Sequence, residues 1–226
     1  MIPDESSGQM LSTSPVSVVS DLFTNRLSTS MNDKLSLEEF IRLVPAAIRE
    51  QQKSLQAPSK TDPVTSIFHR LDLTRSEVSQ YSHTTPLKNY TRNLVATDNK
   101  TFTLLMLCWN PNKSSPIHDH PCNGCWMRVL QGSVNEKRYV KDTENNVLVC
   151  TQDTTFYQGD ETFIDDNLGY HKIGNNAEDL AISLHLYSPP FGECRIWCDE
   201  NNSSKSSVSR MCNYFSEYGH LIEPEE

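Results

Sequence analysis

Residues 116–132 read PIHDHPCNGCWMRVLQG and carry a His-x-His pair, His118 and His120. Side chains alternate between the two faces of an extended strand, so both imidazoles point to one face and can bind one metal ion together. Residues 126–130 are predicted to form a strand, and Gln131-Gly132 a turn into the next strand. The best candidate for a third ligand is His171, which stands in another short segment bounded by turn residues. The alternative is that these histidines are ordinary hydrogen-bonded residues without a metal.

Short candidate strands fill the second half of the chain. Apolar runs alternate with turn residues from position 89 onward, and we expect further strands at residues 90–95, 101–109, 133–140, 147–151, 161–164, 181–187 and 195–198. Many short strands at such spacing are typical of a β-sandwich or a β-barrel. Residues 203–209 are expected to be a polar link between elements.

Three short helices are predicted ahead of the strands. Ser36-Leu37-Glu38-Glu39 has the form of a capping box, and apolar residues then recur at helical spacing as far as Ile48. Pro45 inside this pattern is expected to kink the helix. Residues 64–71 and 74–81 are the other two candidates. Helices followed by many strands predict an α+β chain that is mainly β.

Length and composition set the class of protein. The chain has 226 residues, 36% of them hydrophobic and 22% charged, which suits one domain or at most two. We expect a mobile Ser/Thr-rich leader at residues 1–32 and a single domain at residues 33–226. A net charge of −9 without a Lys/Arg run predicts no nucleic-acid partner. No apolar stretch is long enough to cross a bilayer, and no signal peptide is apparent. We therefore expect no membrane association and a cytoplasmic location. We also expect a monomer.

Seven cysteines, an odd number, predict reduced thiols rather than a disulfide framework. Two pairs, Cys122 with Cys125 and Cys194 with Cys198, leave open a four-cysteine zinc site, although the second pair lacks the usual spacing.

The segment Ser183-Leu184-His185-Leu186-Tyr187 alternates between polar and apolar residues. A strand with this pattern places a hydroxyl, an imidazole and a phenol on one face and both leucines on the other. Taken by itself, this pattern favours an amphipathic surface strand. The resemblance described next is what points to a functional site.

Two sets of motifs resemble known families. The His-x-His pair, Cys125 and Gly132, followed by His171 and Asn175, resemble the two signature motifs of the cupin barrel, although many cupins have a glutamate ligand where this chain has Cys125. More specifically, the chain resembles the eukaryotic cysteine dioxygenases, small cupins that oxidise L-cysteine to cysteine sulfinate with non-haem iron and dioxygen. The matching segments are YTRNLV (90–95), IHDH (117–120), Cys125, LQG (130–132), His171 and SLHLYSPPF (183–191). The resemblance implies a cupin, a small β-barrel or jelly-roll, after the three helices.

The resemblance also implies a cofactor and substrates. His118, His120 and His171 would bind Fe(2+), leaving positions for L-cysteine and O2. Arg92 would bind the substrate carboxylate, with Tyr90 beside it, since a planar guanidinium suits a carboxylate partner. Such an enzyme would serve cysteine catabolism, towards taurine and sulfate.

Four further residues match the neighbourhood of the metal in this family. Cys125 and Tyr187 match the pair that eukaryotic members join through a thioether bond, and Tyr187 would steer oxygen. His185 and Ser183 match residues that hold the tyrosine by hydrogen bonds. Cys122 is a departure from the family pattern and offers a rival thiol to Cys125.

Other functions remain open at this point. The chain could be a thiol dioxygenase for 3-mercaptopropionate or cysteamine. Arg92 argues against cysteamine, which has no carboxylate. The chain could also be a cupin that binds a metal or a small ligand without turnover, since a fold does not imply an activity.

Overall fold

The computed structural model describes residues 34–53, 62–211 and 213–223, and the described residues from Leu35 onward belong to one compact unit. The predicted leader at residues 1–32 lies outside the described residues. Within the described ranges, no helix has the length and apolar character needed to span a bilayer.

The three predicted helices are present. They are α2 (Leu37–Gln51), α3 (Pro63–Arg70) and α4 (Arg75–Tyr81). Ser36 and Glu39 form the expected capping box at the start of α2, and the helix continues through Pro45 to Gln51. Asp62 caps α3, where Pro63 suits the first turn because its missing N–H has no partner there in any helix.

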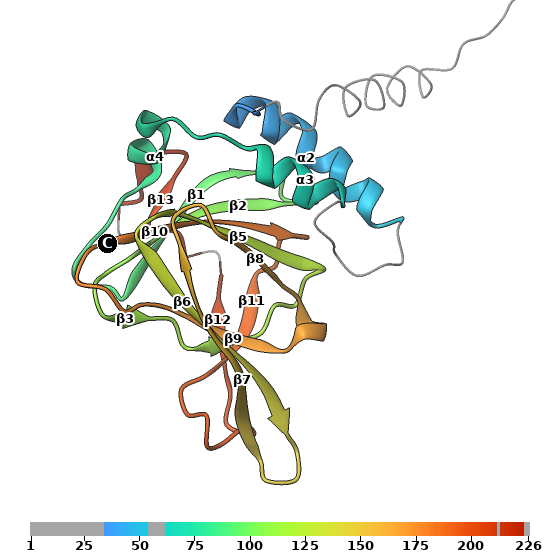
Figure 1. Cartoon of the computed structure of the whole chain (residues 1–226), viewed down its shortest axis with the longest axis vertical. Helices are drawn as coiled ribbons and strands as arrows, with labels where there is room; N and C mark the ends of the chain where they lie inside the picture. Colours follow the sequence, from blue (N-terminus) through green and yellow to red (C-terminus); the bar gives the residue numbers. More distant parts are fainter. Residues whose placement is uncertain (1–33, 54–61, 212, 224–226) are drawn as a thin grey trace, which may run out of the picture. The chain divides into compact units, whose positions relative to one another are not determined.

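Fourteen strands of the described chain form two sheets. Figure 1 shows their arrangement. The first sheet has the order β14-β13-β1-β2-β10-β5-β8, and the second has the order β12-β11-β4-β9-β6-β7 with β3 paired to β9. The bounds are β1 (Tyr90–Thr97), β2 (Thr103–Trp109), β3 (Lys113–Ser114), β4 (Ile117–His118), β5 (Gly124–Gln131), β6 (Ser133–Asp142), β7 (Val147–Tyr157), β8 (Glu161–Ile164), β9 (Tyr170–Asn175), β10 (Ala181–Ser188), β11 (Glu193–Trp197), β12 (Ser207–Arg210), β13 (Ser216–Glu217) and β14 (His220–Leu221).

The two sheets share a buried core. Leu105 and Met127 from the first sheet belong to the same buried cluster as Val134 and Ile173 from the second. Helices α2 and α3 lie against the other face of the first sheet (Figure 1). There the Trp126 indole donates to Thr65 Oγ1 at 3.0 Å. This arrangement is the jelly-roll form of the expected fold.

Two expectations about the strands were wrong or incomplete. Residues 207–209 of the expected polar link belong to β12, which pairs with β11 in the register Cys194↔Ser209. Strand β7 runs to Tyr157, six residues beyond its predicted end, because it pairs with β6 along almost its whole length. Both strands lie at sheet edges and are largely exposed, so their sequences lack a clear apolar alternation.

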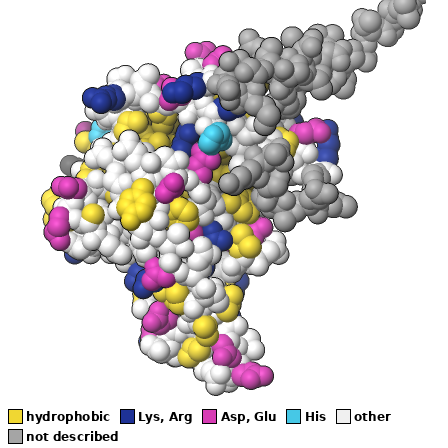
Figure 2. All heavy atoms as spheres, viewed as in Figure 1, with side chains coloured by type: hydrophobic (Ala, Val, Ile, Leu, Met, Phe, Trp, Pro, Cys, Tyr) yellow, Lys and Arg dark blue, Asp and Glu magenta, His cyan; other side chains and the backbone are white. Residues whose placement is uncertain are grey.

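The face of the molecule drawn in Figure 2 carries interspersed acidic and basic side chains.

Candidate metal centre

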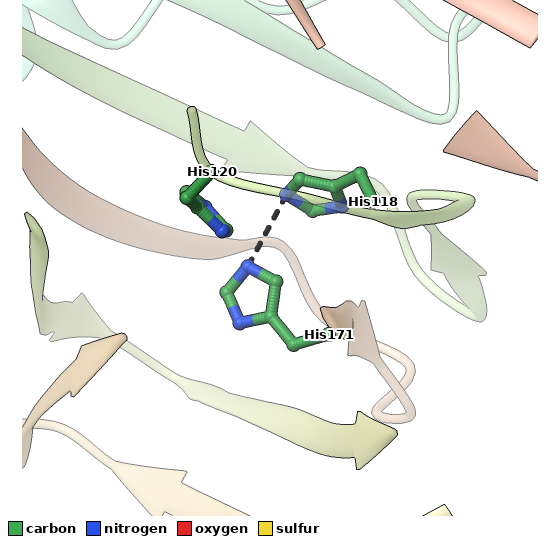
Figure 3. Close-up of side chains that lie close together, drawn as sticks. All are labelled: His118, His120 and His171. Carbon is green, nitrogen blue, oxygen red and sulfur yellow. Dashed lines mark hydrogen bonds between the residues drawn. The ribbon is translucent and has the colours of Figure 1, made fainter. Parts of the chain in front are cut away.

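Three imidazoles meet between strands β4 and β9. His118 ends β4 and lies directly opposite His171 of β9, and His120 follows two residues later. The Nε2 atoms of His118 and His171 are 3.2 Å apart, and one nitrogen of each of the three rings lies within 4.8 Å of the others. Figure 3 shows the rings turned toward one another. The predicted His-x-His pair and third histidine therefore form one cluster.

No other group of three or more His, Cys, Asp or Glu side chains in the described residues is placed to hold a metal ion. The four-cysteine zinc site is therefore wrong. The one such group in the described residues contains no cysteine.

The hydrogen bonds of the rings fix which nitrogens face the cluster. His118 Nδ1 donates to the Pro116 carbonyl at 3.1 Å, because a carbonyl can only accept. His171 Nδ1 donates to Glu136 Oε1 at 2.7 Å. The two Nε2 atoms of the neutral rings then present lone pairs to each other at 3.2 Å, which is favourable only with a cation or a proton between them. This donor set fits a metal ion.

Burial also favours the ligand form of these histidines. Desolvation lowers the pKa of His118, and together with the neighbouring imidazoles it lowers the pKa of His120 and His171 far below the usual value. A neutral imidazole is the form that binds a metal. His120 Nδ1 is buried and has no hydrogen-bond partner in the described chain.

Two aspartates hold the backbone around the His-x-His pair. Asp119 accepts from the Arg195 backbone N–H at 2.7 Å and from Arg195 Nε at 3.0 Å. Asp166 accepts from the His120 backbone N–H at 2.9 Å. These bonds attach the loop after β4 to β11 and to the short 3₁₀ helix η1 (Asp166–Leu168).

Arg92 and Tyr90 line the same cavity as His118 and His171. They occupy alternate positions of β1, as predicted, and the Tyr90 ring stacks on Trp109 at 4.6 Å between centroids. Arg92 donates to the Arg210 carbonyl at 3.1 Å and contacts Met211 Sδ at 3.0 Å. Neither contact neutralises its positive charge.

The polar row of β10 is a buried hydrogen-bond chain. Trp109 Nε1 donates to Ser183 Oγ at 2.8 Å, and Ser183 Oγ lies 2.8 Å from His185 Nε2. His185 Nδ1 lies 3.5 Å from the Tyr187 hydroxyl and 3.9 Å from Cys125 Sγ. Every residue of β10 is buried, so the alternative of a surface strand was wrong.

The hydrogen-bond chain suits a neutral His185 in either tautomer. Ser183 Oγ accepts from the indole, and it can either donate its own hydrogen to Nε2 or accept a second hydrogen from it. Burial lowers the pKa of His185 to about 3, so the ring is neutral. Burial also raises the pKa of Cys125 and of Tyr187 well above their usual values, so both keep their protons near neutral pH.

Glu136 and Arg138 are residues of the site that the sequence reasoning missed. Glu136 contacts His171 and is 1% exposed, and Arg138 contacts Glu136 at 3.0 Å. The available signal was the strand period, because Glu136 shares a face of the predicted strand with the apolar Val134. A carboxylate in the inward register of a core strand indicates a buried partner.

Two facing sheets, with a His-x-His pair at the end of one strand and the third histidine on the neighbouring strand, define a cupin. The pattern of the family described as Cysteine dioxygenase type I matches residues 40–200, and the chain belongs to this family. Membership confirms the resemblance and the fold class drawn from the sequence.

Relatives with this description share about a third of the aligned residues. The chain is 35% identical over 132 residues to cysteine dioxygenase type 1 of Rattus norvegicus and of Homo sapiens, and 35% identical over 135 residues to that of Danio rerio. The match covers 58% of this chain and 64% of the rat and human proteins, somewhat less than two thirds of their length. Among solved structures, a Klebsiella pneumoniae protein with a double-stranded β-helix domain has 17% identity and a TM-score of 0.40, covering 50% of this chain and 81% of its own.

Proposed function

We propose that this protein is a non-haem iron thiol dioxygenase that oxidises L-cysteine with O2 to cysteine sulfinic acid. The observation that carries the proposal is the cluster of three neutral imidazoles, two of which, His118 and His171, line a cavity that also contains Arg92. Family membership supports the same reaction. The reaction balances without another reactant, because both oxygen atoms of O2 are added to the sulfur.

The ligand set favours an anionic sulfur. Three imidazoles contribute no negative charge, so an ion held by His118, His120 and His171 keeps its full positive charge toward the substrate. Iron in this position would supply binding of the thiolate and of O2 and the redox chemistry that zinc lacks. Lowered pKa values keep all three rings available as ligands.

Arg92 would bind the carboxylate of the substrate. Its guanidinium lies in the same cavity as His118 and His171, and its contacts within the described chain are a thioether and a carbonyl. A guanidinium with uncompensated charge forms strong paired hydrogen bonds with a carboxylate. Binding at this point would turn the thiol end of cysteine toward the histidines.

Tyr187 would steer oxygen by donating a hydrogen bond. Its raised pKa keeps the phenol protonated, and its ring lies 6.2 Å from that of His120 between centroids. His185, held by Ser183, lies 3.5 Å from the phenol oxygen through its Nδ1 atom. When the ring hydrogen is on Nδ1, the phenol oxygen accepts it and the phenol hydrogen is available to a ligand at the metal site.

The test is oxygen uptake by the iron-loaded full chain, offered cysteine, 3-mercaptopropionate and cysteamine in turn, with sulfinate products identified by mass spectrometry. We expect cysteine to give the highest kcat/KM and one O2 consumed per sulfinate formed. A preference for either other thiol would overturn the substrate assignment. If protein shown to hold iron consumes no oxygen with any of the three thiols, a binding function without turnover is favoured. The metal-free protein is the control.

The pathway towards taurine and sulfate, the cytoplasmic location and the monomeric state stay predictions.

A further inference from the structure

Behind His171, on the side away from the cavity, lies a buried pair of opposite charges. Glu136 and Arg138 occupy alternate positions of β6. Their side chains are 1% and 15% exposed, and Arg138 Nε lies 3.0 Å from Glu136 Oε2. Arg138 lies outside the motifs of the proposed iron and substrate sites.

Both oxygens of the Glu136 carboxylate are occupied. Oε1 accepts from His171 Nδ1 at 2.7 Å, and Oε2 accepts from Arg138 Nε at 3.0 Å and from Thr162 Oγ1 at 3.4 Å. The carboxylate cannot rotate without breaking at least one of these bonds in a buried setting, where an unsatisfied polar group is costly. The plane of the carboxylate therefore fixes the direction of the imidazole N–H.

Arg138 is itself fixed by a strand of the other sheet. Its Nη2 donates to Thr162 Oγ1 at 2.8 Å and to the Phe163 carbonyl at 2.7 Å. Both acceptors belong to β8 in the first sheet, whereas β6 and His171 belong to the second. The guanidinium thus joins the two sheets at the position from which it holds Glu136.

We propose that Arg138 is a positioning residue for the metal centre, which it sets through Glu136 and His171. The inference rests on the proposed metal site and goes beyond it by assigning metal affinity to a side chain that touches no ligand atom. Partners of a ligating imidazole typically change metal affinity about 10- to 100-fold when they are removed. Arg138 contacts Glu136 rather than His171, and it acts by holding the Glu136 carboxylate in its orientation.

The test measures Co(II) affinity of the full chain by competition with a chromophoric chelator at one fixed pH. We expect Arg138→Leu to weaken Co(II) binding about 10-fold and Glu136→Gln about 10- to 100-fold. The double variant should bind about as weakly as Glu136→Gln alone, because both residues act along one path. Arg138→Lys retains the charge without the planar fork and should recover only part of the affinity.

The matched control is Lys137→Leu, which removes the same charge from the neighbouring position of β6. Lys137 is 42% exposed and pairs with Asp153 across the hairpin, so its loss should leave Co(II) affinity within twofold of the wild type. The visible spectrum of bound Co(II) reports the ligand geometry and should shift in Arg138→Leu but not in the control.

The outcomes separate this inference from the proposed function. A Co(II) affinity of Arg138→Leu within twofold of the wild type would overturn the inference, even if cysteine were turned over and Glu136→Gln bound weakly. Should Arg138→Leu fail to fold, Arg138→Lys decides the question by the same criterion. If Arg138→Leu binds Co(II) more weakly than the wild type, the positioning role is supported. If the iron-loaded wild type at the same time consumes no oxygen with any of the three thiols, the dioxygenase proposal alone is overturned.

Discussion

Cys125 of β5 and Tyr187 of β10 are directly opposed on neighbouring antiparallel strands. Residues in this relation have Cβ atoms about 4.5–5.5 Å apart and side chains on the same face of the sheet. Both side chains lie in the buried cluster beside the metal site, and His185 contacts both. The register therefore holds a thiol against a phenol ring.

We predict that some molecules join these two side chains through a thioether bond between Cys125 Sγ and the Tyr187 ring. The bond replaces one S–H and one ring C–H, with O2 taking up the two electrons and two protons. Intact mass under denaturing and reducing conditions should show a species that lacks two hydrogen atoms. Cys125→Ser should abolish this species.

The rival thiol provides the control for the thioether. Cys122 is partly buried and packs against the same cluster, and burial raises its pKa to about 12. Cys122→Ser should retain the lighter species, because only Cys125 faces Tyr187 across the strand pair. Loss of the lighter species in Cys122→Ser but not in Cys125→Ser would contradict the prediction and assign the bond to Cys122.

Substrate recognition by Arg92 can be tested by comparing two thiols. Arg92→Ala should lower kcat/KM for cysteine about 10- to 100-fold, the size expected for a lost hydrogen-bonded charge pair of about 1.5–3 kcal/mol. Turnover of cysteamine, which lacks a carboxylate, should change much less. Arg210→Ala is the matched control, because it removes a nearby exposed charge but keeps the carbonyl that Arg92 contacts. Equal losses for both thiols would contradict the assignment.

Local patterns predicted the parts of the site that depend on strand alternation. The polar residues of β10 follow one another at a period of two, which strand geometry alone dictates. The convergence of His118 and His120 was predicted from the same period, although β4 ends at His118 and the loop after it brings His120 to the cluster. The contact between His171 and Glu136 could not be predicted in this way, because it depends on the pairing of β6 with β9. Strand β9 itself is short and buried at most positions, so its sequence shows no alternation.

Edge strands were predicted least well for a related reason. The side chains of β12 are mostly exposed, and its position is set by backbone pairing with β11 rather than by burial of apolar residues. A polar sequence is compatible with such a strand and equally with a loop. Pairing of this kind becomes visible only in three dimensions.

Arg128 stabilises the attachment of α3 to the first sheet. Its Nη2 donates to the Leu71 carbonyl at 2.7 Å, and its Nη1 donates to the His69 carbonyl at 3.3 Å, both at the C-terminal end of the helix. A cation at this end satisfies carbonyls that lack helical partners. The guanidinium also lies over the Phe68 ring, 5.4 Å from its centroid.

We predict that Arg128→Met lowers the free energy of unfolding by about 1–3 kcal/mol, because the carbonyls of Leu71 and His69 lose their donor and the ring of Phe68 loses its cation. Urea denaturation followed by circular dichroism measures this change. Lys141→Met, at an exposed position of β6, is the control and should change stability by less than about 0.5 kcal/mol. Equal stability of Arg128→Met and the wild type would show that α3 docks without the arginine.

The turn between β1 and β2 should contribute a pH-dependent part of the stability. Burial raises the pKa of Asp98, but hydrogen bonds from the Thr101 side chain and the backbone N–H groups of residues 100–102 outweigh it and lower the pKa to about 2. The unfolded chain has an aspartate pKa of about 3.9, so the ionised group favours the folded state above this value. The contribution is lost as the pH falls from about 4 to about 2. Because Asp98 is mostly exposed, solvent screening keeps this contribution below about 1 kcal/mol.

Urea titrations measure the prediction. Asp98→Ala should have a lower free energy of unfolding than the wild type at pH 7, and the difference should shrink below pH 4. Glu144→Ala in an exposed turn should show no difference from the wild type. A deficit for Asp98→Ala that stays constant down to pH 2 would mean that the turn acts through its shape rather than its charge.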